Sequence, residues 1–430
     1  MTSSALALIA AAVFAWGAFS ARLERADLTA PIAFVGVGVL LAAVSGVGVD
    51  GAAGVAVLTE VTLAWVLFSD AARVGVRELR ADSGVYARLL GVALPLTVSA
   101  GALAAWGLLG VETPWLALLI GAALAPTDAA LGAVVITHPA VPVRIRRIMN
   151  VESGLNDGIV TPIVMVALAG AASAPEHAGG NALAAVLQLA GGALIGAVVG
   201  VAGGSLLRVA GRRGWTADGF AGPAVLALAL VAYTAALAGH GNGFVAAFAG
   251  GIAFGRVAGS GGPREVSYVE QTAGLASLVV WLLFGAVAVP LLYGRIDGTL
   301  ILYAVLSLTA VRMVPVALSL VGARFGARAV LFVGWFGPRG LASVVFALLA
   351  VEHLGERADP AVAIIVLTVL LSVVAHGLTA GPCATRFGAR VTPSGGRVSP
   401  SDEPAAGEPA AAERLRSSSK DAIRRRGARS

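Results

Sequence analysis

The sequence predicts an all-α membrane protein with many transmembrane helices. The chain has 430 residues, of which 58% are hydrophobic and only 13% are charged, whereas soluble domains carry roughly 25% charged residues. Apolar stretches of about 20 residues, the length at which a helix crosses a bilayer, recur along the chain. These two observations favour a polytopic membrane protein over a soluble protein with one very large apolar core.

We predict thirteen transmembrane spans. They lie near residues 4–20, 28–48, 53–69, 86–110, 115–137, 150–172, 181–207, 220–239, 241–258, 272–293, 298–322, 329–351 and 361–382. The segment from Met1 to Arg22 lacks a basic start and a clear cleavage site, so we interpret it as the first span and not as a removed signal peptide.

The charges of the connecting loops alternate. Arginines follow every odd-numbered span, at Arg22 and Arg25, Arg73 to Arg80, Arg144 to Arg147, Arg208 to Arg213, Arg256 and Arg264, Arg324 and Arg328, and Arg386 and Arg390. The loops between them are acidic, glycine-rich or short, with Arg295 and Arg357, each beside an acid, as exceptions. The positive-inside rule therefore predicts that the N-terminus lies outside and the C-terminus in the cytoplasm. We expect the protein to lie in the plasma membrane. The same arginines account for much of the net charge of +6, so the charge is no sign of nucleic-acid binding.

The character of the chain changes near its C-terminal end. Residues 391–430 are polar, charged and rich in Pro, Gly and Ser, a composition that cannot bury enough apolar surface to fold alone. We interpret this segment as a disordered, solvated cytoplasmic tail, although its basic end at Arg424 to Arg426 is also suited to anionic lipid. Residues 1–390 are predicted to form the transmembrane domain, without a nucleotide-binding domain. The single cysteine, Cys383, excludes an internal disulfide.

Two predicted spans are interrupted. The fifth is broken at Ala125 to Asp128 and the twelfth at Gly337 to Gly340. This spacing suggests two inverted six-helix repeats, spans 2–7 and 8–13, with broken crossing helices 5 and 12. Interrupted helices at matching places in two halves point to a transport site.

The fifth span carries the motif Pro126-Thr127-Asp128. Proline removes an amide donor, so nearby carbonyls lose their helical partners. Together with the Thr127 hydroxyl and the Asp128 carboxylate, these carbonyls form a set of hard oxygen ligands suited to a small cation. The alternative is a proline kink in which Asp128 caps the following half-helix.

The sixth span carries Glu152-Ser153-Gly154-Leu155-Asn156-Asp157. On a helix, Ser153, Asn156 and Asp157 share one face, and Glu152 lies at its edge. Ionised carboxylates at membrane depth mark an ion or proton path by default. We assign Asp157 the working role, because a buried carboxylate can hold either a proton or a cation. Glu152 is interpreted as half of a buried ion pair with an arginine.

Two arginines at membrane depth are candidates for the partner of Glu152. Arg339 in the twelfth span is the first choice, and Arg312 in the eleventh could also reach Glu152 or a broken helix end. The alternative is that either side chain extends to the cytoplasmic surface.

The third span carries two acids of different depth. Glu60 lies near its middle and is predicted to line the cation route, whereas Asp70 lies at its cytoplasmic end and is interpreted as a surface partner of Arg73. His138, His240 and His376 are interpreted as ordinary solvated side chains, since no histidine pair has metal-ligand spacing.

At these residues the chain resembles the monovalent cation:proton antiporters of the NhaP and eukaryotic sodium/proton exchanger type. The resemblance covers about residues 1–390 and rests on PTD in the fifth span, ESGLNDG in the sixth and GPRG in the twelfth. GNGFVAAFAGGIAFG and WLLFGAVAV in the ninth and tenth spans are similar to weaker motifs of the same family. In one departure, Ala129 follows Asp128 where many members have proline.

The resemblance implies a secondary transporter and not an enzyme. It implies a homodimer in membrane lipid, with an ion-binding core around spans 4–6 and 11–13 and a dimer scaffold from the rest. It further implies electroneutral exchange of Na⁺ or Li⁺, with K⁺ as a further candidate, for H⁺, and a role in pH homeostasis. No cofactor, nucleotide or nucleic acid is expected.

The resemblance also implies roles for single residues. Asp157 carries the cation and the proton, Asp128, Thr127 and Ser153 complete the cation site, and Asn156 supports it. Glu152 would pair with Arg339. The acid of the third span is hard to align, so both Glu60 and Asp70 are candidates for one further cation contact.

Two other function classes are compatible with part of this pattern. A cation channel, or a sensor without flux, would share the polar spans but show large currents or no exchange. An intramembrane aspartyl protease could use two membrane aspartates to activate a water molecule, but it would leave the predicted Glu–Arg pair without a role.

Overall fold

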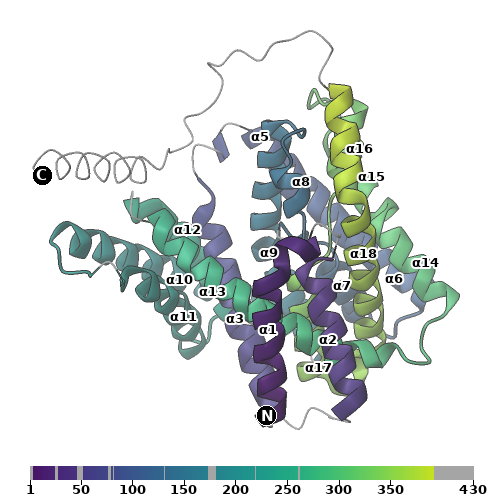
Figure 1. Ribbon diagram of the computed structural model, residues 1–430, viewed down its shortest axis with the longest axis horizontal. Helices are drawn as coiled ribbons and strands as arrows, with labels where there is room; N and C mark the ends of the chain where they lie inside the picture. Colours follow the sequence, from purple (N-terminus) through teal and green to yellow (C-terminus); the bar gives the residue numbers. More distant parts are fainter. Residues whose placement is uncertain are drawn as a thin grey trace, which may run out of the picture. The chain divides into compact units, whose positions relative to one another are not determined.

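The computed structural model describes residues 3–24, 28–45, 52–75, 79–80, 82–129, 131–172, 181–217, 219–259 and 262–391, and these residues form helices and no strands (Figure 1). The α-helices are α1 Ser3–Glu24, α2 Ala30–Ser45, α3 Ala52–Arg73, α5 Ser83–Arg88, α6 Leu94–Leu109, α7 Pro114–Ala123, α8 Ala133–Thr137, α9 Val143–Ala172, α10 Asn181–Arg212, α11 Ala221–Ala238, α12 Gly243–Val257, α13 Gly262–Leu283, α14 Gly298–Leu308, α15 Ala310–Ser319, α16 Ala327–Trp335, α17 Leu341–Leu354 and α18 Asp359–Val391. Short π- and 3-10 helices are η1 Leu89–Ala93, η4 Phe284–Ala288, η5 Val289–Leu292 and η6 Gly355–Ala358. The predicted tail lies outside the described residues.

Each predicted span overlaps a described helix or a pair of broken helices. Eight helical stretches among the described residues are long and apolar enough to cross a membrane, and three apolar helices are shorter. The all-α membrane fold is thus confirmed, while the total of thirteen spans and the two six-helix repeats stay predictions. The breaks of spans 5 and 12 are seven spans apart, whereas the predicted halves, spans 2–7 and 8–13, are offset by six.

Several helix boundaries differ from the prediction. α9 begins at Val143, directly after Pro142, whose carbonyl accepts from the Ile145 and Arg146 N–H groups. Arg144 to Arg147 therefore belong to the first turns of a helix and not to a loop. The eleventh span is also broken, because Thr309 has non-helical dihedrals between α14 and α15. This third break frees the carbonyls at the end of α14.

Glycines allow close helix packing in the group formed by α3 and α10 to α13. α10 packs along α12, where a side chain at Gly196 or Gly200 would overlap the backbone of Ala246 or Gly250. Small residues let helix backbones approach in this way in membranes. Whether this group is a scaffold separate from an ion-binding core stays a prediction.

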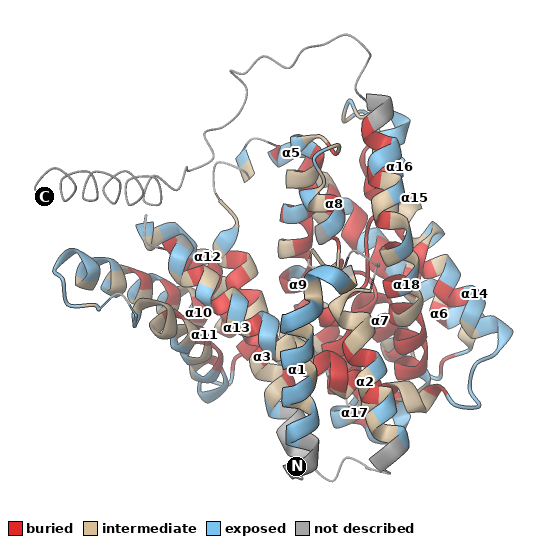
Figure 2. Cartoon of the chain, in the orientation of Figure 1, coloured by how far each residue is buried: buried red, intermediate tan, exposed pale blue. Residues whose placement is uncertain are grey.

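The deepest burial lies in the helices that carry the breaks. A large apolar cluster joins α7, α9, α17 and α18, with residues such as Leu119, Val160 and Ile364 fully buried. Figure 2 shows buried segments concentrated in this group and exposed segments along α1 and α10. Exposed apolar side chains on these outer helices, such as Phe14 and Leu194, suit a surface that faces lipid.

One acid outside the membrane spans ties the start of α9 to the start of α5. The buried Asp82 carboxylate accepts hydrogen bonds from Arg144 Nε at 2.8 Å and Arg147 Nη2 at 2.5 Å. Burial alone would raise the pKa of the Asp82 carboxyl, but hydrogen bonds from Arg147 and Arg144, together with their charges, lower it below its ordinary value. Asp82 therefore favours the folded state most when it is ionised.

We expect Asp82→Asn to lower the free energy of unfolding at pH 7 by about 1.5–3 kcal/mol, the usual range for a hydrogen bond to a charged group. Because the pKa of the folded state is lowered, this stabilisation is present above the ordinary value of 3.8 and is lost as the pH falls below it. Thermal unfolding of the wild type and Asp82→Asn in detergent, at pH 7 and at a pH below 3.8, checks this prediction. A difference between the proteins that does not shrink in acid would contradict the prediction.

Candidate functional site

The breaks of the fifth and twelfth spans meet each other. The Asp128 N–H donates to the Pro338 carbonyl at 2.9 Å. The Asp128 carboxylate accepts from the Leu131 N–H at 3.2 Å and, across the break, from the Leu341 N–H at 3.0 Å. Asp128 thus caps the start of α17, where the helix dipole favours a negative charge. A side chain at Gly340 would overlap this carboxylate, so glycine is needed there for the close approach.

Arg339 satisfies carbonyls that the breaks release. Its Nη1 donates to the Ala125 carbonyl at 2.6 Å and the Pro126 carbonyl at 3.3 Å, and its Nη2 donates to the Ser307 carbonyl at 3.1 Å. The residue is fully buried. Its positive charge therefore lies where the ends of α7 and α14 carry partial negative charge. The released carbonyls of Ala125 and Pro126, which the sequence suggested as cation ligands, accept from Arg339 instead.

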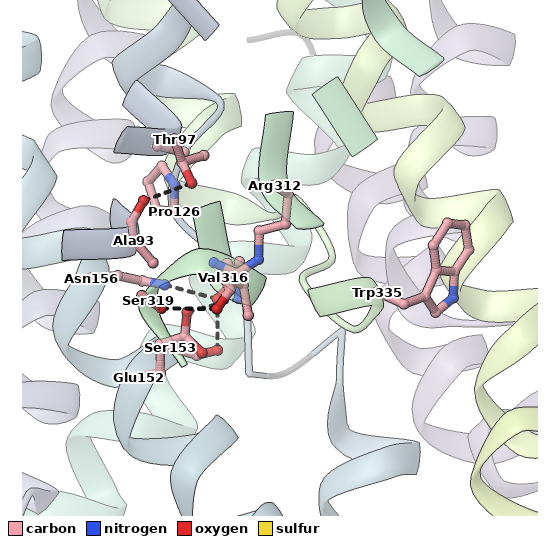
Figure 3. Close-up of polar contacts among 12 residues, drawn as sticks. Ala93, Thr97, Pro126, Glu152, Ser153, Asn156, Arg312, Val316, Ser319 and Trp335 are labelled. Atoms are coloured by element: carbon pink, nitrogen blue, oxygen red, sulfur yellow. Dashed lines mark hydrogen bonds and ion pairs between the residues drawn. The ribbon is translucent and has the colours of Figure 1, made fainter. Parts of the chain in front are cut away.

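Glu152 pairs with Arg312 and not with Arg339, which corrects the first choice made from the sequence. Arg312 Nη2 lies 2.7 Å from Glu152 Oε1, and the two side chains are only 2% and 4% exposed. Gly337 makes room for the guanidinium, since a Cβ there would lie 2.6 Å from Arg312 Nε. Figure 3 shows Arg312 reaching from α15 toward Glu152 on α9. The pair locks α15 to α9, because separating either charge from its partner at this depth is costly.

The polar face of α9 contacts the break in the fifth span. The Thr127 hydroxyl lies 2.9 Å from the Ser153 hydroxyl and accepts from Asn156 Nδ2 at 2.8 Å. Figure 3 shows Ser153 and Asn156 on the same side of α9 as Glu152. Asn156 is fully buried, and its Oδ1 has no hydrogen-bond partner among the described residues. The structure thus brings Thr127 together with Ser153 and Asn156, two residues whose helical spacing predicted a shared face.

Asp157 is the carboxylate of this face without a donor. It is 8% exposed, and within the described part of the chain no N–H or O–H group donates a hydrogen bond to it. Its electrostatic neighbours are the carboxylates of Asp128 and Asp70. A buried carboxylate in these surroundings is costly unless it binds a proton or a cation. The next residue, Gly158, lies against the ring of Phe248 on α12.

The two acids of the third span lie in different places. Glu60 Oε2 accepts from the Tyr233 hydroxyl at 2.9 Å, and ten helical residues, about 15 Å, separate it from Asp70. Asp70 packs against α9, where a Cβ at Gly154 would lie 3.8 Å from the Asp70 Cβ.

The placement of Glu60 beside the cation site was therefore not supported, and Asp70 is the acid near Asp157. Arg73 forms its ion pair with Glu270 at 2.5 Å, not with Asp70. Spacing along one helix could not have decided between the two acids, since both lie on α3.

The polar groups that meet at this site are carboxylates, hydroxyls and the side-chain amide of Asn156. In the described residues, no three His, Cys, Asp or Glu side chains gather as a resident metal cluster. A small hard cation prefers oxygen ligands. The carboxylates, hydroxyls and amide oxygen of this site are therefore of the kind that such a cation prefers.

Comparisons with known proteins agree with this architecture. A family model described as "Sodium/hydrogen exchanger, transmembrane" matches residues 8–386. The chain is similar to a structure of the sodium proton antiporter MjNhaP1 from Methanocaldococcus jannaschii at pH 8, with a TM-score of 0.73, 19% identity and coverage of 90% of this chain and 99% of that chain. An electron-microscopy structure of the same antiporter gives a TM-score of 0.69 and 20% identity over 91% and 100% of the two chains. At this identity the likeness shows a shared fold. No curated protein matches the chain.

Proposed function

Because the chain belongs to the sodium/hydrogen exchanger family, we propose that it is a secondary antiporter in which a monovalent cation and a proton compete for Asp157. The observation that carries the proposal is the buried Asp157 carboxylate, which lies near Asp128 and has no hydrogen-bond donor among the described residues. A single carboxylate cannot hold both ions, so binding of one favours release of the other. One cation for one proton makes the exchange electroneutral.

The other site residues support binding in this proposal. Asp128 and the hydroxyls of Thr127 and Ser153 supply oxygen ligands for Na⁺ or Li⁺, with K⁺ as a larger candidate. Asn156 Nδ2 donates to the Thr127 hydroxyl at 2.8 Å. The Asn156 Oδ1, which has no hydrogen-bond partner among the described residues, remains available to contact a cation. The pair Glu152–Arg312 and the contacts of Arg339 hold the broken helices in register.

Alternating access would move the helices with the breaks against α3 and α10 to α13. This motion is the usual consequence of broken helices that meet at a midplane site. The arginine-rich ends of α3 and α9 support an orientation with these ends in the cytoplasm of a plasma-membrane protein. A homodimer whose scaffold is formed by α1 to α3 and α10 to α13 belongs to the same proposal.

Transport in proteoliposomes tests the proposal. An inward gradient of NaCl, LiCl or KCl should drive proton efflux, read with an internal pH dye, without a membrane current. Competition for one carboxylate predicts that the apparent KM for the cation rises by up to about tenfold for each unit of pH decrease, while the maximal rate stays constant. A KM that does not depend on pH, or a large current, would refute competitive electroneutral exchange.

The placement of Asp70 gives a further prediction. We expect Asp70→Asn to raise the apparent KM for Na⁺ about three- to tenfold, because it removes a negative charge near Asp157 that attracts the cation. Glu60→Gln should change the KM less than about twofold, since Glu60 lies far from Asp70 along α3 and bonds Tyr233 on α11. Sodium-dependent exchange at pH 8 measures both variants. The reverse order of effects would restore Glu60 as the acid of the cation route.

A further inference from the structure

A polar stripe on α18 faces the break of the twelfth span. Ser372, His376 and Thr379 are spaced by four and three residues, so they lie on one face of the helix. Ser372 is fully buried and His376 is 3% exposed, so the interpretation of His376 as a solvated side chain was wrong. The rings of Trp335 and Phe336 lie beside the imidazole, at centroid distances of 5.1 and 6.3 Å.

Two of these side chains hold both sides of the break. The Arg339 N–H donates to Ser372 Oγ at 2.7 Å, and Ser372 Oγ lies 3.1 Å from His376 Nδ1. His376 Nε2 lies 2.8 Å from the Trp335 carbonyl. Trp335 is the last residue of α16, and Arg339 lies two residues before α17.

A neutral imidazole with its proton on Nε2 satisfies the contacts with the Trp335 carbonyl and the Ser372 hydroxyl. Its Nδ1 also lies 2.9 Å from the Ser372 carbonyl, to which the ring donates only when Nδ1 carries a proton. With its proton on Nε2, the ring donates to the Trp335 carbonyl, and its Nδ1 accepts from the Ser372 hydroxyl. The hydroxyl in turn accepts from the Arg339 N–H. In this tautomer, donors and acceptors alternate along one series of hydrogen bonds from the Arg339 N–H to the Trp335 carbonyl. Apolar replacement of His376 would leave the Trp335 carbonyl and the Ser372 hydroxyl without this partner.

The segment held in this way is the one that binds Asp128. Its Pro338 carbonyl accepts from the Asp128 N–H, and the Leu341 N–H directly beyond it donates to the Asp128 carboxylate. Both groups lie within three residues of Arg339. A shift of this segment would therefore move the Asp128 carboxylate relative to Asp157 on α9.

We propose that His376 is a positioning residue, which together with Ser372 clamps residues Trp335 to Arg339 so that Asp128 is held in the geometry that binds the transported cation. The proposal rests on the proposed exchange function. His376 and Ser372 touch neither the cation nor the proton carrier. Their loss should weaken cation binding and leave the turnover of the saturated protein nearly unchanged.

The experiment compares four variants for Na⁺-driven proton efflux in proteoliposomes. His376→Leu removes all three polar contacts of the ring. Ser372→Ala removes the hydroxyl between Arg339 and His376, and His376→Gln retains a donor toward the Trp335 carbonyl. The matched control is Thr379→Val, which breaks the bond from Trp335 Nε1 on the same helix face but leaves the backbone of the break untouched.

We expect His376→Leu and Ser372→Ala to raise the apparent KM for Na⁺ about three- to tenfold, the effect of one lost hydrogen bond, with the maximal rate within about twofold of wild type. His376→Gln should recover part of the affinity, and Thr379→Val should match wild type. A wild-type KM in both His376→Leu and Ser372→Ala would overturn the proposal. So would a loss of maximal rate at unchanged KM, or an equal rise of KM in Thr379→Val.

A binding measurement separates this inference from the proposed function. Thermal unfolding is followed against NaCl, with choline chloride holding the ionic strength constant. If wild type is stabilised by Na⁺ but does not exchange it, the proposed function fails while the clamp can still be judged. In that case a half-saturating Na⁺ concentration raised about three- to tenfold in His376→Leu supports the clamp, and an unchanged concentration overturns it.

Discussion

Replacing Asp157 with asparagine is expected to abolish cation-driven proton movement while leaving the protein folded. The amide cannot take up and release a proton and offers no charge to a cation, so both halves of the exchange are lost. Burying a neutral amide costs less than burying a carboxylate, so the melting temperature should be unchanged or higher. Proteoliposome exchange should fall by at least about a hundredfold, which corresponds to roughly 2.7 kcal/mol.

The control for this experiment is Asp297→Asn. Asp297 is an exposed aspartate that accepts from the Leu300 N–H at the start of α14, and asparagine caps a helix about as well as aspartate. This variant should exchange like wild type. If Asp157→Asn and Asp297→Asn transport equally well, Asp157 is not the carrier and the competition mechanism is wrong.

Removing one partner of the pair Glu152–Arg312 is expected to give the largest loss of stability. Both side chains are almost fully buried, so Arg312→Met leaves a carboxylate without compensation and should lower the free energy of unfolding by about 3–5 kcal/mol. The double variant Glu152→Leu/Arg312→Met should recover most of this loss, because well-packed apolar residues can replace a buried pair. Thermal unfolding in detergent of the wild type, the two single variants and the double variant measures this double-mutant cycle.

Two comparisons make this cycle decisive. Arg295→Met breaks the pair with Asp359, whose side chains are 44% and 24% exposed, and should cost less than about 1 kcal/mol. Arg339→Met should destabilise but should not be rescued by Glu152→Leu, because Arg339 bonds backbone carbonyls. Rescue of Arg339→Met in place of Arg312→Met would show that Arg339 is the partner of Glu152 after all.

The sequence alone determined the class of fold and the site segments. Apolar length set the spans, and Pro126, together with the glycines beside Pro338, predicted two of the breaks at the right residues. These features are local, because a bilayer fixes the length of a span and proline removes a hydrogen bond wherever it stands. The helical spacing of Ser153, Asn156 and Asp157 likewise predicted one shared face before any tertiary contact was known.

Only the tertiary structure decided which side chains meet. Arg312 and Arg339 are equally buried and equally charged, yet one reaches Glu152 and the other reaches the carbonyls of Ala125 and Ser307. Asp70, and not Glu60, lies near Asp157, and His376 is buried against a break that is far from it in the sequence. The physical reason is that a sequence pattern fixes the face and depth of a side chain on its own helix. Its partner depends on how neighbouring helices are rotated and where they are interrupted, which only the packing of the whole chain sets.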